Sequence, residues 1–574
     1  MKDIKNLVLF ICFLFVYFLA TFFVCNRPVY LDKSSEFILL TIFLLFPIIY
    51  LILYLSHSYN ITFLVITFLI TIFYIADSLI YSVRNKHIVL YDFFHIRDAI
   101  GVYDRYNLRF STKILAYLIV FIILNLLSYK VFKSRKFKQN KLFLGLLFCS
   151  IIYILPLNIL KPLKINPYPK GVNFNSNVVF QLSGIYSLYY QVINSSINIS
   201  SQDIKDGEKI LSSYSEIDGS GDIKYICILN ESFTDYSLIG KTKFKDPLSN
   251  IHSRDDIFEG KLYTSVFGGN TCDTEFEFLT GCSLHFFPDM YSPFTFMNLK
   301  NINSISREFK NSYAIHPFFE QEYNRLYIYN SLGFKDFISG EDFYTDSTGK
   351  DYDFYLPEDV SLTGSMVYNA FGDKIDYVRG LVSDKECFNK IVDTLDNKDT
   401  NFIYAVTIQN HGGYELGLDS YKYTDNSIIN EYLECLSLSD DAFCNLIDTL
   451  KDRDDKIVVM MYGDHQPYLN TNIEDYVEGW NNDTKYCTPY LVWSNFGVDI
   501  DNLLNETSVN YLTTILKEVS NSSLTSFDNF KLDYIKIYPV ITRNFVKVDN
   551  KFIYRNDDSL DLSDYEKVQK SLYK

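Results

Sequence analysis

Long apolar runs dominate the first 160 residues of the chain. Most of them approach the roughly 20 residues that an α-helix needs to cross a ~30 Å hydrocarbon core. A single cleaved leader would account for the first run but not for those that follow it, and such uninterrupted apolar character disfavours buried helices of a soluble core. The pattern therefore predicts five membrane-spanning helices, at about 7–25, 37–55, 61–82, 114–129 and 142–160.

The short loop between the fourth and fifth runs predicts the orientation. It holds no acidic residue and six basic ones, namely Lys130, Lys133, Arg135, Lys136, Lys138 and Lys141. By the positive-inside rule this loop is cytoplasmic, which places the N-terminus inside and the chain beyond residue 160 outside the cell membrane. The loop 83–113 argues against this orientation, since it is placed outside and yet has six basic residues and three Asp.

The second half of the chain has a different pattern. Short β-branched or aromatic runs at 223–230, 402–410, 456–464 and 489–495 alternate with helix-like stretches such as Ile429–Lys451. Continuous apolar runs of this length favour buried parallel strands, and the alternation favours an α/β domain with a mostly parallel central sheet.

A Pro-containing stretch separates the two halves. Its segment 178–193 is apolar and aromatic, so it either lies at the membrane interface or packs on the globular domain. We therefore predict a five-helix membrane domain at 1–160, a juxtamembrane linker at 161–221, an extracellular α/β domain at 222–545 and a C-terminal tail at 546–574.

Charge follows the same division. The whole chain has a net charge of −16, but residues 1–163 hold 17 basic and 7 acidic residues, and the remainder holds 36 and 62. This excludes a nucleic-acid binder that works through a basic face, as well as a disordered chain. Seven of the ten cysteines lie in the acidic half without a repeated CxxC spacing, so no complete disulfide framework is indicated, although Cys272 and Cys282 could pair.

Candidate chemistry lies at the ends of two predicted strands. Glu231 follows one strand, and Asp464 with His465 follows another. Because the carboxyl ends of parallel strands meet at one edge of a sheet, these groups could bind one divalent cation, and their mixed ligation suits Zn²⁺ or Mn²⁺ better than Ca²⁺. Taken singly, each has an ordinary interpretation as a turn, a helix cap or an exposed carboxylate; their combination favours a site.

Between these strands lies the segment Gly268-Gly269-Asn270-Thr271, followed by a predicted helix at Glu275–Leu279. It is most simply a turn with a threonine cap. The same placement puts Thr271 near a helix N-terminus, where backbone N–H groups and the helix dipole favour phosphate or sulfate. A metal beside the hydroxyl would make it a nucleophile.

A series of sequence blocks resembles one family. The order ILNESF, FGGNTCDTEFEFLTG, AIHPFF with a following YNR, TIQNHGGY, YGDHQP and TPYLVWSN is similar to the lipoteichoic acid synthase family, within the sulfatase/alkaline phosphatase-like superfamily. Five membrane helices followed by an outer sulfatase-like domain are also that family's architecture. The resemblance covers essentially the whole chain and is most specific over 223–496.

The resemblance implies a role for each matched residue. The metal ligands would be Glu231, Thr271, Asp464 and His465, holding one ion that is normally Mn²⁺-like, with Zn²⁺ or Mg²⁺ as alternatives. Thr271 would also be the nucleophile. His411 would be catalytic as well, contacting the phosphoryl group to bind it or to assist proton transfer. The other residues implied to contact the substrate are His316, Tyr323 and Arg325, around a glycerophosphate head group. An arginine there is sensible on its own, because its planar fork binds phosphate oxygens in pairs.

The implied activity is a membrane-bound phosphoglycerol transferase. It would move glycerol phosphate from phosphatidylglycerol, or a similar glycerophospholipid, to a glycerol-phosphate polymer or glycan through a covalent threonine intermediate. Phosphoethanolamine transfer, phosphodiester hydrolysis and a non-catalytic envelope scaffold are the alternatives. Sulfatase activity is disfavoured because Cys272 is followed by Asp-Thr-Glu, and the small number of histidines favours one metal over two. For His285 we expect no catalytic role.

Overall fold

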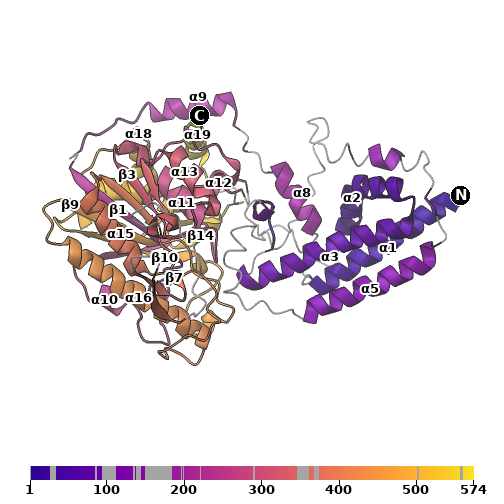
Figure 1. Cartoon of the computed structure of the whole chain (residues 1–574). Coiled ribbons are helices and arrows are strands. Elements are labelled where there is room, and N and C mark those ends of the chain that lie inside the picture. Colours follow the sequence, from indigo (N-terminus) through magenta and orange to yellow (C-terminus); the bar gives the residue numbers. More distant parts are fainter. Residues whose placement is uncertain are drawn as a thin grey trace. The chain divides into compact units, whose positions relative to one another are not determined.

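The computed structural model describes residues 2–25, 34–84, 87–93, 112–133, 136–137, 144–148, 151, 184–194, 197, 199–219, 222–288, 291–344, 361–367, 374–500, 503–555, 557 and 560–573. The chain divides into two compact units, which are drawn in Figure 1. The N-terminal unit comprises mainly Met1–Phe94 and Leu108–Ser196, and the C-terminal unit comprises mainly Ile197–Phe287 and Ser292–Lys574.

The N-terminal unit is helical. Its helices are α1 (Lys2–Cys25), α2 (Ser34–Ser56), α3 (Tyr59–Arg84), α5 (Thr112–Phe132) and α8 (Gly184–Asn194). Helix α1 packs against α2, α3 and α5, and side chains such as Leu14 and Phe63 are buried between them. Apolar side chains also cover the outside of α5, where Leu115 and Leu126 are each 60% exposed, as expected for a surface that meets lipid rather than water.

Two helices of the described residues are long and apolar enough to cross a membrane, over Tyr59–Tyr81 and Ile114–Phe132. Shorter apolar stretches lie in α1 and α2, at Lys5–Thr21 and Thr41–Ser56. The predicted runs at 61–82 and 114–129 therefore coincide with spanning candidates. Most of the fifth predicted run, 142–160, lies outside the described residues, so five spans stay a prediction.

The C-terminal unit is built around an eight-stranded sheet of order β11-β2-β10-β9-β1-β8-β3-β4. Its strands are β1 (Ile223–Asn230), β2 (Phe258–Tyr263), β3 (Ser312–Ile315), β4 (Asp336–Ile338), β8 (Phe402–Val406), β9 (Lys456–Gly463), β10 (Cys487–Ser494) and β11 (Glu506–Ser508). Strands β9, β1, β8, β3 and β4 are mutually parallel, which confirms the mostly parallel α/β fold.

One strand prediction was wrong in direction. The run at 489–495 forms β10, but this strand is antiparallel to both β9 and β2. Apolar character shows that a strand is buried on both faces, and β10 is buried along nearly its whole length, but it does not encode which way the chain enters the sheet.

Helices cover both faces of this sheet. The α-helices of this unit in the described residues are α9 (Ser201–Leu211), α10 (Ser249–His252), α11 (Thr271–Thr280), α12 (Pro293–Phe296), α13 (Arg325–Leu332), α14 (Gly340–Tyr344), α15 (Asp384–Asn397), α16 (Ser427–Leu450), α17 (Leu512–Val519), α18 (Ser526–Ile535) and α19 (Ser563–Ser571). Ile226 and Ile228 of β1 point into a core shared with α15 and α16. On the other face, Phe278 of α11 stacks on Tyr404 and Tyr462.

Two small antiparallel sheets complete the unit. One contains β5 (Thr363–Val367), β6 (Lys374–Val378) and β7 (Leu381–Val382), and the other contains β12 (Val540–Ile541), β13 (Phe545–Val548) and β14 (Lys551–Tyr554). At the C-terminus, α19 packs against α9, and its residue Gln569 donates to the Ser283 carbonyl at 2.8 Å.

Candidate functional site

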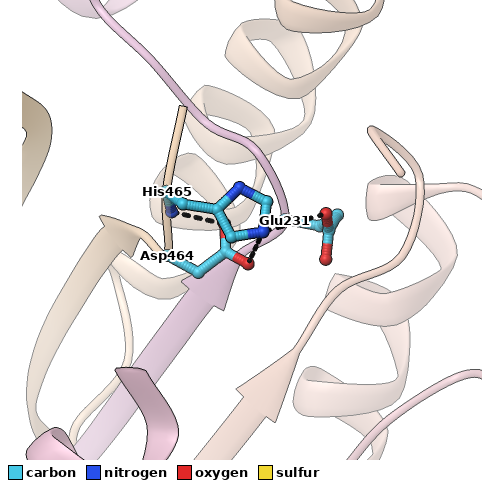
Figure 2. Close-up of side chains that lie close together, drawn as sticks. All are labelled: Glu231, Asp464 and His465. Atoms are coloured by element: carbon cyan, nitrogen blue, oxygen red, sulfur yellow. Dashed lines mark hydrogen bonds and ion pairs between the residues drawn. The ribbon is translucent and has the colours of Figure 1, made fainter. Parts of the chain in front are cut away.

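Adjacent strand ends bring the predicted acidic and histidine side chains together. Strands β1 and β9 are direct neighbours, with Asn230 opposite Gly463, so Glu231 and Asp464 leave the sheet side by side. The ligand atoms of Glu231, Asp464 and His465 all lie within 4.8 Å of one another, and Figure 2 shows the three side chains converging. Every one of them is buried.

Thr271, at the start of helix α11, also lies in this group. It is the first residue of α11, as predicted, and its hydroxyl donates to Asp464 Oδ2 at 2.7 Å and lies 3.3 Å from Glu231 Oε2. The turn before it needs left-handed backbone at Gly268 and Asn270, with φ of 65° and 73°. The Gly-Gly-Asn sequence supplies that conformation at low cost, which aims the threonine hydroxyl at the two carboxylates.

The chain can make this close junction because one strand ends in glycine. A Cβ at Gly463 would lie 2.0 Å from the carbonyl oxygen of Phe233, so no larger residue fits. Ser232, next to Glu231, has a φ of 51°, and its backbone N–H donates to Asp464 Oδ1 at 2.7 Å. Strain of this kind persists where surrounding contacts impose it, here at the point where the two acidic side chains meet.

The electrostatics of the group suit a divalent cation. Burial raises the pKa of Glu231 and of Asp464, and the charge of Asp464 raises the pKa of Glu231 further. Nδ1 of His465 lies 3.1 Å from the Gln466 carbonyl oxygen, so Nε2 faces Asp464 Oδ2 at 3.1 Å. Two buried carboxylates, one imidazole and a hydroxyl fit the mixed ligation of Zn²⁺ or Mn²⁺, whose charge would offset the repulsion between the carboxylates.

The predicted head-group residues form a second group, in which His316 and Arg325 are buried and Tyr323 is partly exposed. Arg325 is 1% exposed, and its guanidinium donates to Glu275 Oε1 at 2.8 Å and to Glu322 Oε2 at 2.9 Å. His316 Nε2 lies 2.9 Å from Arg325 Nη1, and the Tyr323 ring lies 5.1 Å from the guanidinium carbon. The structure thus brings His316, Tyr323 and Arg325 together.

Sequence reasoning missed the two carboxylates that hold this arginine. Glu275 lies one helical turn after Thr271, so the spacing along α11 could have placed it beside the threonine. Glu322 lies three residues before Arg325, and no pattern in the sequence singled it out. Burial would raise the pKa of Glu322, but the hydrogen bond with His316 and the charges of Arg325, His316 and His411 lower it to about 2.

His411 lies in the loop that follows β8, and it is half-buried. The neighbouring Thr407 hydroxyl accepts from the Glu231 backbone N–H at 3.1 Å, so this loop starts beside the acidic pair. The charge of His411 lowers the pKa of Glu322, and the charge of Glu322 raises the pKa of Glu231. The histidine therefore belongs to the same electrostatic environment as the acidic pair.

A second cluster of metal-ligand residue types contains Asp235, His252 and Glu259. His252 Nδ1 also lies 2.7 Å from Asp246 Oδ2, while its Nε2 lies 3.2 Å from Asp235 Oδ2. Hydrogen bonds to these carboxylates raise the pKa of His252 to about 12, so the ring is cationic at neutral pH and itself compensates the acidic charge.

Two further expectations concern residues near α11. His285 is buried, and burial lowers its pKa to about 4; its Nδ1 lies 2.8 Å from the Thr542 carbonyl, which is an ordinary core contact. Cys272 and Cys282, which the sequence left open as a pair, are both free and buried.

Comparison with known proteins matches one family. The model of the Sulfatase family matches residues 224–517, which is half of the chain. Among curated proteins, a Rhizobium meliloti (strain 1021) protein named for cyclic beta-1,2-glucan modification is 28% identical over 295 residues, covering 47% of this chain and 41% of the relative. A Haemophilus influenzae protein of uncharacterized function is 23% identical over 275 residues, covering 43% and 44%. The chain thus spans less than half the length of these relatives.

Among solved structures, the phosphoglycerol transferase GacH of Streptococcus pyogenes, in complex with sn-glycerol-1-phosphate, superposes with a TM-score of 0.50. It is 21% identical, and the match covers 66% of this chain and 93% of that one. At this identity the likeness supports the fold, with the same α/β architecture, and says nothing by itself of the reaction.

Proposed function

The chain belongs to the Sulfatase family, and from that premise we propose that it is a membrane-bound phosphoglycerol transferase. The donor would be phosphatidylglycerol or a similar glycerophospholipid, and the acceptor a glycerol-phosphate polymer or a glycan of the cell envelope. The Rhizobium meliloti relative, named for the modification of a glucan, supports a glycan acceptor. The motif resemblance around Asn324-Arg325 and Asn410–Gly413 supports the glycerophosphate donor over phosphoethanolamine.

One observation carries the proposal. The hydroxyl of Thr271 lies within hydrogen-bond distance of two buried carboxylates, beside an imidazole and at the N-terminus of a ten-residue helix. Hydroxyl, acids and histidine so arranged favour nucleophilic attack on a phosphate ester, because the helix N-terminus attracts the anionic group and the carboxylates orient the hydroxyl.

Glu231, Thr271, Asp464 and His465 would hold one divalent cation, Mn²⁺ in our proposal, with Zn²⁺ and Mg²⁺ as alternatives. When bound, the cation would lower the pKa of the threonine hydroxyl and neutralise charge on the phosphate. Asp464 Oδ2 accepts the hydroxyl hydrogen of Thr271 at 2.7 Å and thereby orients the oxygen.

The proposed reaction has two balanced transfers. Thr271 Oγ1 forms a bond to phosphorus and loses its proton, while the bond from phosphorus to the diacylglycerol oxygen breaks and that oxygen gains a proton. An acceptor hydroxyl then attacks the glycerophospho-threonine, loses its proton, and releases Thr271 Oγ1, which regains one. His411 would bind the phosphoryl oxygens or relay these protons, and His316, Tyr323 and Arg325 would line the head-group pocket.

The helices of the N-terminal unit would keep the enzyme beside its lipid donor. We propose that they span the cell membrane several times, with the N-terminus in the cytoplasm and the C-terminal unit outside. The apolar spans Tyr59–Tyr81 and Ile114–Phe132 support membrane insertion, and the basic loop after residue 129 supports this orientation. We likewise propose that the membrane domain ends at residue 160, the linker at 221 and the outer domain at 545.

Reconstitution tests the function directly. The full chain in liposomes with labelled phosphatidylglycerol and Mn²⁺ should release diacylglycerol and carry glycerophosphate on Thr271, detected by mass spectrometry. Thr271→Ala should abolish both, with a loss of about 10⁴-fold or more, whereas Thr280→Ala, at the other end of α11, should retain them. Absence of release by the unmodified chain would refute the donor, and release from phosphatidylethanolamine instead would assign the phosphoethanolamine alternative.

A further inference from the structure

The loop that carries His411 is irregular, yet a buried arginine from a different sheet holds it. Arg379 lies in the turn between β6 and β7 with a φ of 52°, and it is 1% exposed. Its guanidinium donates to the His411 carbonyl at 3.1 Å and to the Gly413 carbonyl at 2.5 Å. It also lies over the ring of Tyr414, 4.6 Å from the ring centre. Three of the four residues from His411 to Tyr414 therefore contact one side chain.

The partner of this arginine holds the next segment of the loop. Arg379 Nε donates to Glu431 Oε1 at 2.8 Å, and Glu431, on α16, is fully buried. The second oxygen of Glu431 accepts from the backbone N–H groups of Gly417 at 3.0 Å and Leu418 at 3.3 Å. The ion pair thus holds the loop at two successive segments, 411–413 and 417–418.

A buried ion pair contributes little net stability compared with a well-packed apolar pair, because both ions must lose water. The pair does constrain geometry, because the N–H groups of a planar guanidinium point in fixed directions and carbonyl oxygens must lie along those directions to bind. The carbonyls that Arg379 selects are those of the His411 segment. These partners give Arg379 a role in the conformation of the His411 segment, in addition to any loss of stability that its removal would cause.

A hydrogen bond also fixes this loop relative to the candidate site. Asn410 Nδ2 donates to Asn230 Oδ1 at 3.2 Å, and Asn230 immediately precedes Glu231. The Tyr414 hydroxyl donates to the Asn410 carbonyl, which closes the turn around the histidine. A displacement of the loop would therefore move His411 relative to Glu231 and the residues beside it.

We infer that Arg379, paired with Glu431, is a positioning residue that fixes His411 toward the group transferred at Thr271. The inference rests on the proposed function for its catalytic consequence. The contacts of Arg379 that carry the inference are those with Glu431 and with the loop carbonyls, so the arginine acts through the histidine.

Non-additive kinetics test the inference. Arg379→Met should lower kcat by about 10- to 100-fold with KM little changed, as expected for a misplaced catalytic group. The double variant with His411→Ala should be no slower than His411→Ala alone, because the arginine acts through that histidine. Arg379→Lys should recover part of the rate. Multiplying losses in the double variant would overturn the inference.

A matched control separates positioning from general stability. Lys517, on α17, is another buried cation, and it pairs with Asp528 and Glu308 far from the His411 loop in sequence. Lys517→Met should lower the thermal midpoint, while kcat of the folded fraction stays within about twofold of the wild-type value. Its effect on kcat should multiply with the effect of His411→Ala on kcat. A kcat loss equal to that of Arg379→Met would overturn the inference.

Hydrogen exchange provides a readout that needs no substrate. In Arg379→Met, amide exchange of a peptide covering 409–418 should rise at least tenfold, while the peptide covering 271–280 of α11 keeps its protection. Unchanged protection of 409–418, or equal loss in both peptides, would overturn the positioning role. If the wild-type chain fails to turn over phosphatidylglycerol, the proposed function fails, and the exchange experiment still decides the role of Arg379.

Discussion

Replacing Arg325 with methionine should destabilise the C-terminal unit strongly. Its guanidinium lies between Glu275, whose side chain is fully buried, and Glu322, whose side chain is 10% exposed. Methionine keeps much of the side-chain volume but removes the guanidinium from both carboxylates, and Glu322 keeps its contact with His316 Nε2 at 3.1 Å. Breaking a buried ion pair by removing one partner costs about 3–5 kcal/mol, because the remaining charge has neither water nor a counter-ion.

The structure also predicts a partial rescue. Adding Glu275→Gln to Arg325→Met removes the more deeply buried of the two stranded charges. Replacement of both members of a buried pair is often close to neutral, so the double variant should recover roughly half of the loss, about 2 kcal/mol. Lys536→Met is the matched control: Lys536 pairs with Asp533 at the surface, where both side chains are more than half exposed, and its loss should cost less than about 1 kcal/mol.

Tryptophan fluorescence can measure this unit alone, because the only two tryptophans of the chain, Trp480 and Trp493, both lie in it. Denaturant titration should give a lowered midpoint with an unchanged slope for Arg325→Met. A midpoint equal to that of Lys536→Met, or a double variant less stable than Arg325→Met, would refute the account of stranded charges.

Three further predictions use the same unit. Because the pKa of Glu322 is lowered to about 2, its carboxylate should contribute roughly 3 kcal/mol to the free energy of unfolding. This contribution is fully present above about pH 5 and is lost as pH falls toward 2. Glu322→Gln should flatten the pH dependence of the unfolding midpoint in that window, and an unchanged curve would contradict the assignment. Gly463→Ala, whose Cβ would lie 2.0 Å from the Phe233 carbonyl, should cost at least about 1–3 kcal/mol and weaken Mn²⁺ binding measured by calorimetry, whereas a wild-type midpoint would show that the strand ends can separate. Cys272 and Cys282 are buried with raised pKa values, so iodoacetamide should label them only after unfolding, and a reductant should leave the midpoint unchanged; labelling in the native protein would contradict their burial.

The strand ends could be predicted because two independent signals agreed there. Apolar runs predicted strands at 223–230 and 456–464, and β1 and β9 occupy those residues almost without change. Acidic and histidine residues at the ends of such strands must meet if the strands are parallel neighbours. The direction of β10 could not be predicted in the same way, because a continuous apolar run has the same pattern whether the strand is parallel or antiparallel to its neighbours.

The partners of the arginines were not predictable for a different reason. Arg325 and Arg379 both choose carboxylates distant in sequence, Glu275 and Glu431, which lie 50 and 52 residues away. The spacing along α11 places Glu275 near Thr271, but nothing in the local pattern of α11 or α16 pairs these carboxylates with the two arginines, since a glutamate in a helix is ordinarily a solvated residue. Their burial is decided by the packing of whole helices on the sheet, which no spacing rule describes.

The two arginines also differ in what their ion pairs can do. Arg325 bridges Glu275 of α11, the helix that begins with Thr271, and Glu322 of the turn before α13, so it couples the helix of the proposed nucleophile to the predicted head-group pocket. Arg379 couples a small separate sheet to the loop of His411. Each places one predicted catalytic element against the sheet edge where Glu231 and Asp464 emerge. The acidic group at that edge is set by strand order alone, whereas the histidine and the head-group pocket depend on buried charges. Substitutions in the arginine pairs should therefore lower turnover while the acidic group still binds a cation, and substitutions at Gly463 should weaken cation binding itself.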